Sequence, residues 1–143
     1  MHAFRSRQSR TWVGFGATAI TVLGVFLAAR AYAKIALNTI DPVAVITDNG
    51  RQIIVSGPVT ATAGERGFQR VTVTQRSTGA VAEGYVILDY TGSPQHWEVR
   101  ASTVGNATFT EGPATAVAIA LCTDRGTATD AHQWLVNINL VNE

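Results

Sequence analysis

Three side chains near the C-terminus have the chemistry of metal ligands. Asp124, Asp130 and His132 carry carboxylate oxygens and an imidazole nitrogen, which bind divalent cations in proteins. Their spacing matches no calcium-binding loop, because the regular series of oxygen ligands and its closing glutamate are missing. The alternative is an Asp-rich turn whose side chains bond to their own backbone, and we favour that interpretation.

Two tryptophans occur in similar short sequences, Gln95-His96-Trp97 and His132-Gln133-Trp134. A pair of such strand ends could line a groove for a sugar or a peptide. Strand-borne tryptophans more often fill the core and keep a polar tip in water. We therefore predict that Trp97 and Trp134 are core residues, with a binding groove as the alternative.

No motif for catalysis stands out. A serine nucleophile needs a histidine base that an acid orients, and the chain has three histidines, His2, His96 and His132. It contains no Gly-x-Ser-x-Gly elbow, no phosphate-binding glycine loop outside the apolar N-terminal segment, and no recognisable pair of carboxylates for glycosidic chemistry. The sequence thus predicts no catalytic residue, no cofactor and no enzyme.

Cys122 is the only cysteine, so an intrachain disulfide is impossible. A free cysteine usually behaves as a small buried apolar residue, and we predict that role here. A reactive thiol or an intermolecular disulfide would require exposure of the side chain.

The charges are distributed unevenly along the chain. Every charged residue before position 34 is an arginine, and these four leave seven basic against ten acidic residues in the remainder. Binding to nucleic acid requires a clustered basic face that neutralises phosphates. We therefore exclude nucleic acid as a partner.

A long apolar segment precedes the elements that must position these side chains. Residues 11–29 (TWVGFGATAITVLGVFLAA) contain no charge, and as a helix they would extend about 28 Å, close to the thickness of a hydrocarbon core. Arg5, Arg7 and Arg10 precede the segment, so the positive-inside bias predicts a cytoplasmic N-terminus and an exported C-terminal domain.

A second interpretation of the same segment is a signal peptide. Ala31-Tyr32-Ala33 has the small-x-small form that signal peptidase accepts, and cleavage after Ala33 would release a secreted protein. The apolar run is longer than that of most signal peptides, and Arg30 lies between it and the cleavage motif. Both interpretations stay open, and we place the retained membrane anchor slightly ahead.

The rest of the chain has the pattern of an all-β domain. We divide it into a basic N-terminus with the apolar helix (1–33), a connector (34–42) and an exported domain (43–143). Frequent Gly, Pro, Asn and Asp residues separate short apolar runs, and Asn49-Gly50 predicts a tight hairpin turn. The expected strands lie near 43–47, 51–56, 58–62, 68–76, 80–90, 95–104, 106–110, 113–123 and 132–142.

Seven to nine short strands at this spacing predict an Ig-like antiparallel β-sandwich. In the last strand, Trp134, Val136, Ile138 and Leu140 share one face and polar residues share the other. The strand 114–123 is apolar on both faces, one of them mostly alanine. We expect that alanine face to accommodate Trp97 or Trp134 inside the core, with the covering of a partner protein as the alternative.

These observations predict a non-catalytic cell-envelope protein. It would be a membrane-tethered accessory subunit or a protein-binding module, whose membrane contact is made by residues 11–29. The alternatives are a secreted protein that binds metal or carbohydrate through the Asp124–His132 loop or the two tryptophans, and, last, a small hydrolase.

Overall fold

The computed structural model describes residues 35–143. In chain order its elements are β1 (Leu37–Asn38), β2 (Val43–Thr47), η1 (Asp48–Gly50), β3 (Gln52–Thr60), β4 (Arg66–Gln75), β5 (Ala80–Asp89), β6 (Gln95–Thr103), β7 (Gly112–Asp124) and β8 (Thr127–Asn142). The predicted membrane segment 11–29 and the Ala31-Tyr32-Ala33 cleavage motif lie outside the described residues. Within residues 35–143, no helix has the length and apolar character needed to cross a membrane.

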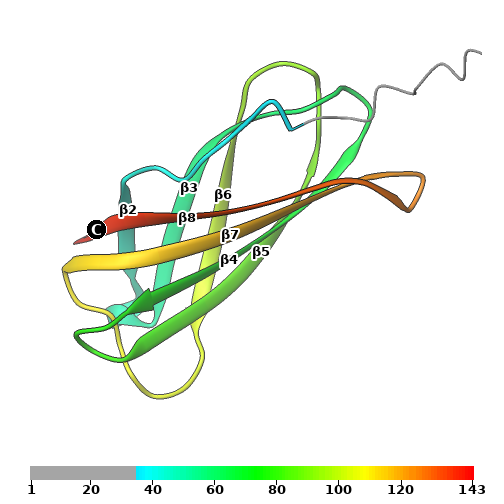
Figure 1. Ribbon diagram of the computed structural model, residues 1–143. Helices are drawn as coiled ribbons and strands as arrows, with labels where there is room; N and C mark the ends of the chain where they lie inside the picture. Colours follow the sequence, from blue (N-terminus) through cyan, green and yellow to red (C-terminus); the bar gives the residue numbers. More distant parts are fainter. Residues whose placement is uncertain (1–34) are drawn as a thin grey trace, which may run out of the picture.

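Seven of the strands close into a mixed β-barrel (Figure 1). The hydrogen-bonded order around the barrel is β3-β2-β8-β7-β4-β5-β6, and β6 pairs with β3 to complete the ring. β2 and β8 run parallel, with Val43 opposite Asn139, and the other neighbours are antiparallel. The short β1 pairs with the end of β3, on the same edge that β2 uses further along.

The predicted Ig-like sandwich is therefore wrong, although the prediction of an all-β domain is confirmed. A sandwich consists of two sheets that face each other and keep separate edges. Here the parallel β2–β8 pair and the β3–β6 pair join all the strands into one closed sheet. Inward and outward side chains alternate along a strand in both architectures, so the alternation in the sequence does not distinguish them.

The hairpin predicted at Asn49-Gly50 is confirmed. η1 joins β2 to β3, which pair antiparallel with Val45 opposite Ile54. Asn49 has a φ of 54° and Gly50 a φ of 82°, and these residue types adopt such left-handed backbone most readily.

β3 is one continuous strand where the sequence predicted two, 51–56 and 58–62. The expected break was at Pro58, which has no N–H to donate. The Pro58 carbonyl accepts a bond from the Thr39 N–H on the β1 side. Since the N and C=O of a strand residue point to the same edge, the missing N–H also faces β1, and the longer ladder with β6 is intact.

A loop closes the barrel end near η1 where the sequence predicted a strand at 106–110. Phe109 is buried there, and its N–H donates to the Gly50 carbonyl. The buried Gln75 side chain holds the next residue, because its amide oxygen accepts the Thr110 N–H and its amide nitrogen donates to the Thr110 carbonyl. Side-chain bonds to backbone replace a strand ladder here.

The alanine face of β7 points into the barrel, as the internal interpretation predicted. Ala116, Ala118 and Ala120 are fully buried, and Ala118 lies opposite Trp134 of β8. Small side chains on one wall leave room for the larger side chains of the other strands in the narrow interior. The bulky residues of β7 consequently lie on the outer surface, where Ile119 is 43% exposed.

Candidate functional site

The proposed metal ligands lie at or near the β7–β8 hairpin, and the structure gives one of them another role. Both carboxylate oxygens of Asp130 accept backbone bonds, one from Ile35 N–H at 3.1 Å and one from Ala131 N–H at 2.9 Å. Asp124 is exposed, with one carboxylate oxygen 4.0 Å from the Arg125 side chain. Within residues 35–143, no three His, Cys, Asp or Glu side chains lie close enough together to hold a metal ion.

The two tryptophans occupy different environments. Trp97 is fully buried, and its indole N–H donates to the side-chain oxygen of Asn38 at 3.2 Å. Trp134 is half-buried, packs on the core and lies against the ring of His132, with 5.4 Å between ring centroids. Trp97 is therefore a core side chain that cannot line an exposed groove.

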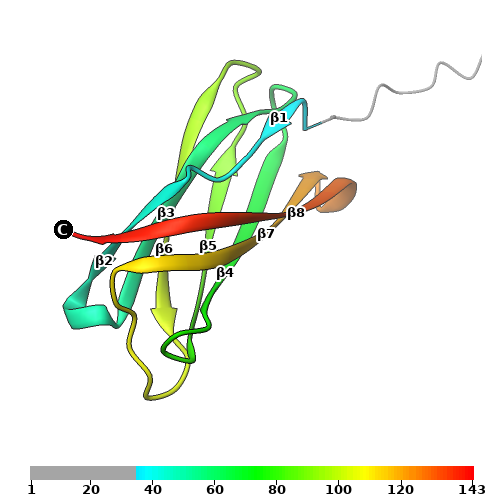
Figure 2. The same cartoon turned by 60° about the vertical axis from the view of Figure 1, so that its left-hand side comes forward.

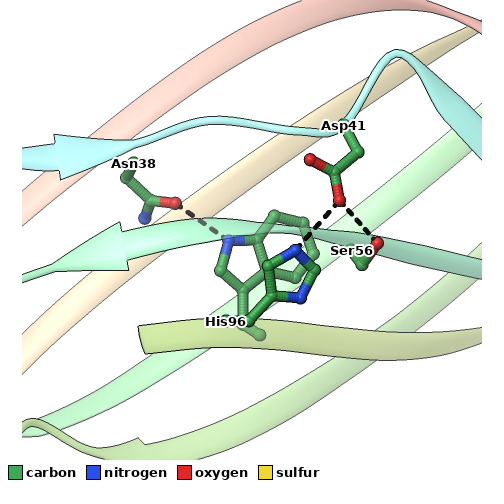
Figure 3. A network of polar contacts seen from close by, with 5 residues as sticks. Asn38, Asp41, Ser56 and His96 are labelled. Atoms are coloured by element: carbon green, nitrogen blue, oxygen red, sulfur yellow. Dashed lines mark hydrogen bonds and ion pairs between the residues drawn. The ribbon is translucent and has the colours of Figure 1, made fainter. Parts of the chain in front are cut away.

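Three polar residues that the sequence analysis did not connect meet on the outside of the barrel (Figure 3). Asp41 comes from the segment before β2, Ser56 from β3 and His96 from β6. The Ser56 hydroxyl donates to the Asp41 carboxylate at 2.8 Å, and His96 Nε2 lies 3.1 Å from the same oxygen. Residues 41 and 96 are far apart in the chain, so no local signal could have identified this cluster.

The order of contacts in this cluster is wrong for a catalytic triad. A triad places the histidine between the nucleophile and the acid, so that the imidazole can take the hydroxyl proton. Here the carboxylate is the shared partner of both other groups. The backbone N–H of Asp41 also donates to the Ser56 carbonyl, and the cluster therefore fastens the chain before β2 to β3 and β6.

A polar group of side chains lies inside the barrel beneath β1. The Asn38 oxygen accepts bonds from the Trp97 indole and, at 3.5 Å, from the Gln69 amide. Gln69 is fully buried. The Asn38 amide nitrogen and the Gln69 amide oxygen have no partner among residues 35–143. Each unpaired buried polar atom has an energetic cost, so the hydrogen bonds of this polar group are only partly satisfied among the described residues.

Cys122 and Tyr90 are buried nearby. Burial, followed by the proximity of Cys122, raises the pKa of Tyr90. Burial also raises the pKa of the Cys122 thiol. A thiol needs its deprotonated form to react as a nucleophile, and the site favours the protonated form. The buried, unreactive cysteine predicted from the sequence agrees with this environment.

The most exposed group of large apolar side chains lies across β5, β4 and β7. Phe68, Tyr85, Ile87 and Ile119 are 38%, 65%, 51% and 43% exposed, and we call this group the apolar outer face. Phe68 lies opposite Ile87, and Arg70 lies opposite both Tyr85 and Ile119. The rings of Phe68 and Tyr85 stack with 5.3 Å between their centroids.

An ion pair lies within the apolar outer face. The Arg70 guanidinium contacts the Glu83 carboxylate at 2.9 Å. Phe68, Arg70, Glu83, Gly84 and Tyr85 line an open hollow of about 340 Å³ beside this pair. The strand 114–123 carried the sequence signal for this surface, because both of its faces are apolar. Only one face of a strand in the barrel wall faces the core, so the other apolar face lies outside.

No protein-family model matches the chain, and no curated protein matches it significantly. A function for this protein therefore has to be argued from its own residues and geometry.

Proposed function

We propose that this protein is an exported, membrane-tethered and non-catalytic module of the cell envelope, which binds a partner protein through the apolar outer face. The observation that carries the proposal is that four large apolar side chains, Phe68, Tyr85, Ile87 and Ile119, lie together in solvent on neighbouring strands. Contiguous exposed apolar surface with a polar surround is characteristic of protein interaction sites.

The composition of this face favours a protein as the ligand. Interfaces between proteins are enriched in aromatic residues and arginine, and these residues often provide the largest contributions to affinity. Tyr85 and Arg70 lie opposite each other beside the hollow, where a partner side chain could insert. The ion pair of Arg70 with Glu83 holds the guanidinium in place before binding.

The other two parts of the proposal, the membrane tether and the absence of catalysis, rest on other observations. The uncharged segment 11–29, with arginines before it, supports an N-terminal anchor and an outside location of the barrel. In the cluster of Ser56, Asp41 and His96, the carboxylate and not the imidazole is the shared partner. This arrangement supports a structural role for the residues that most resemble a catalytic group.

A photo-cross-linking side chain introduced in place of Tyr85, in the full chain in its native membrane, tests the binding proposal. We expect one discrete protein adduct from this position. We expect none from the same side chain in place of Val104, which is equally exposed at 64% but lies in the loop after β6. Adding Arg70→Glu to the Tyr85 variant should remove the adduct. Equal labelling from both positions, or no adduct at Tyr85, would contradict the proposal.

The tether has a separate test, which is the intact mass of the mature protein. A full-length mass supports the anchored form. A mass that begins at Lys34 would show cleavage after Ala33 and would contradict the tether without affecting the binding face.

A further inference from the structure

Two ion pairs on the outer surface of β4 and β5 have the same polarity. Arg66 and Arg70 are on β4, whereas their acidic partners Asp89 and Glu83 are on β5. Side chains of a strand alternate between its two faces, so Arg66, Phe68 and Arg70 all point outward from β4. The outer surface therefore has a positive side along β4 and a negative side along β5.

The apolar part of this surface lies in register between the charges. Phe68 is opposite Ile87 in the β4–β5 ladder, and Arg70 is opposite Tyr85. Phe68, Tyr85 and Ile87 are exposed, and so is half of the Arg70 side chain. This part of the apolar outer face is therefore open to solvent on both strands.

We propose that a second copy of this chain binds the β4 and β5 part of the apolar outer face, around a two-fold axis that runs between these strands and parallel to them. The inference rests on the proposed function and names its partner. Rotation about such an axis places β4 of each copy over β5 of the other. A two-fold contact uses the same surface on both copies, so the surface has to be complementary to itself.

The charges are complementary to themselves about this axis. Arg70 would face the partner's Glu83, and Arg66 would face the partner's Asp89, because each of these pairs already lies on opposite sides of the axis within one copy. Complementary charges across an interface fix its register and suppress wrong partners. Both ion pairs are satisfied by the same axis.

The shape and the apolar side chains also match. Phe68 would face the partner's Ile87. The Tyr85 side chain is 65% exposed, and it stands beside the open hollow that Phe68, Arg70 and Glu83 line. Each Tyr85 ring would enter the hollow of the other copy and lie beside the partner's Arg70, where a guanidinium attracts an aromatic face.

Membrane lipid and a different protein are the alternative occupants. A bilayer that covered this surface would take the charged Arg70 and Glu83 side chains into a nonpolar environment, which is costly. A different protein would need basic and acidic groups in the reverse order, and a second copy already presents that order. The charge pattern therefore favours the second copy.

The same axis suits two copies that are tethered to one membrane. The Ile35 N–H donates to Asp130 of β8, and Thr129 of β8 donates to Glu65, which directly precedes β4. Figures 1 and 2 both show the start of β4 and the β7–β8 hairpin at the end of the barrel where β1 lies. An axis parallel to β4 keeps this end on the same side in both copies. Attachment to one membrane would also raise the effective concentration of the two copies.

Photo-cross-linking from position 85, with the full chain in its native membrane, identifies the partner. Two copies with different tags are produced together, and one of them has a photo-reactive side chain in place of Tyr85. We expect an adduct with the mass of two chains that contains both tags. An adduct with a different protein would overturn the dimer and leave the proposed binding function intact. An adduct with lipid alone, or none, would contradict both.

Reversal of the charges tests the axis. Arg70→Glu would bring four carboxylates together, and Glu83→Arg would bring four guanidinium groups together. We expect each variant alone to give at least about tenfold less dimer adduct, because like charges that face each other across an interface are strongly unfavourable. A mixture of the two variants should restore the adduct as a heterodimer, in which two carboxylates face two guanidinium groups. A mixture that stays as low as the single variants would overturn the proposal.

Arg100→Glu is the matched control for a change of charge. Arg100 also pairs with a glutamate, Glu98, but both lie on β6, outside the proposed contact. This variant should leave the yield of adduct unchanged, and near-ultraviolet circular dichroism of the purified full-length variants should match the wild type. An equal loss of adduct in Arg100→Glu would show a general effect of charge and would overturn the proposed contact.

Discussion

The sequence indicates whether some individual residues are buried. It does not indicate which partners the polar residues bind. The burial of Cys122 followed from its residue type and its apolar neighbours. The Asn38 bond to Trp97 and the meeting of Asp41, Ser56 and His96 could not be predicted. Each of these contacts joins residues from different strands, and a polar residue type alone does not specify its partner.

Cys122 provides a prediction of pH dependence. Its pKa in the folded protein is raised above the ordinary 9.0, mainly by burial. The unfolded chain therefore loses the thiol proton first as pH rises. The stability associated with this proton is fully present below the pKa of the unfolded chain and is lost as pH increases through and above about 9.

Urea unfolding at a series of pH values measures this effect. We expect the free energy of unfolding of the wild type to fall above about pH 9 more steeply than that of Cys122→Ala. Tyr90 is present in both proteins, and burial, the main cause of its raised pKa, acts in both, whereas the smaller contribution of Cys122 to that pKa is lost in Cys122→Ala and forms part of the difference between the curves. Parallel curves would show that the thiol is not held protonated by burial.

At the scale of the element, alternation and turn chemistry predicted most strands to within a few residues. They failed at Pro58, where β3 continues, and at 106–110, where a loop occurs. In both places a contact with a distant segment decides the outcome, from Thr39 to the Pro58 carbonyl and from Gln75 to Thr110. Local propensity does not include such contacts.

The close approach of β3 to the chain just after β1 depends on Gly57. A Cβ at this position would collide with the Thr39 carbonyl and reach 3.0 Å from the Trp97 ring. We expect Gly57→Ala to lower the free energy of unfolding by about 3 kcal/mol, the upper end of the usual cost of overpacking, because the collision is with backbone. Urea denaturation monitored by tryptophan fluorescence measures the change.

Gly64→Ala is the matched control. A Cβ at Gly64 meets nothing within 4 Å, and its positive φ of 85° makes backbone strain the only cost, about 1 kcal/mol. Equal losses in the two variants would contradict a steric role for Gly57.

At the scale of the whole molecule, the seam between β2 and β8 converts a sheet into a barrel. Leu140 is fully buried at this seam, opposite Ala44 of β2 and Gly112 of β7. We expect Leu140→Ala to lower the free energy of unfolding by roughly 2–5 kcal/mol, the range for a buried leucine. Chemical denaturation measures the loss.

Val43→Ala supplies the comparison at the same seam, because Val43 is 47% exposed. It should change the free energy of unfolding by less than about 1 kcal/mol. If Leu140→Ala is no more destabilising than Val43→Ala, the seam does not contribute to the core as described.

The sequence alone determined the all-β class, most strand positions, the hairpin at Asn49-Gly50 and the inward faces of β7 and β8, because these depend on neighbours within a few residues. Only the tertiary structure decided that the sheet closes and that Ile119 joins Phe68 and Tyr85 on an outer face. Pairing between strands far apart in the chain sets both features. The same alternation of side chains is compatible with a sandwich or a barrel, and the long-range hydrogen bonds of β2 with β8 and of β3 with β6 select the barrel.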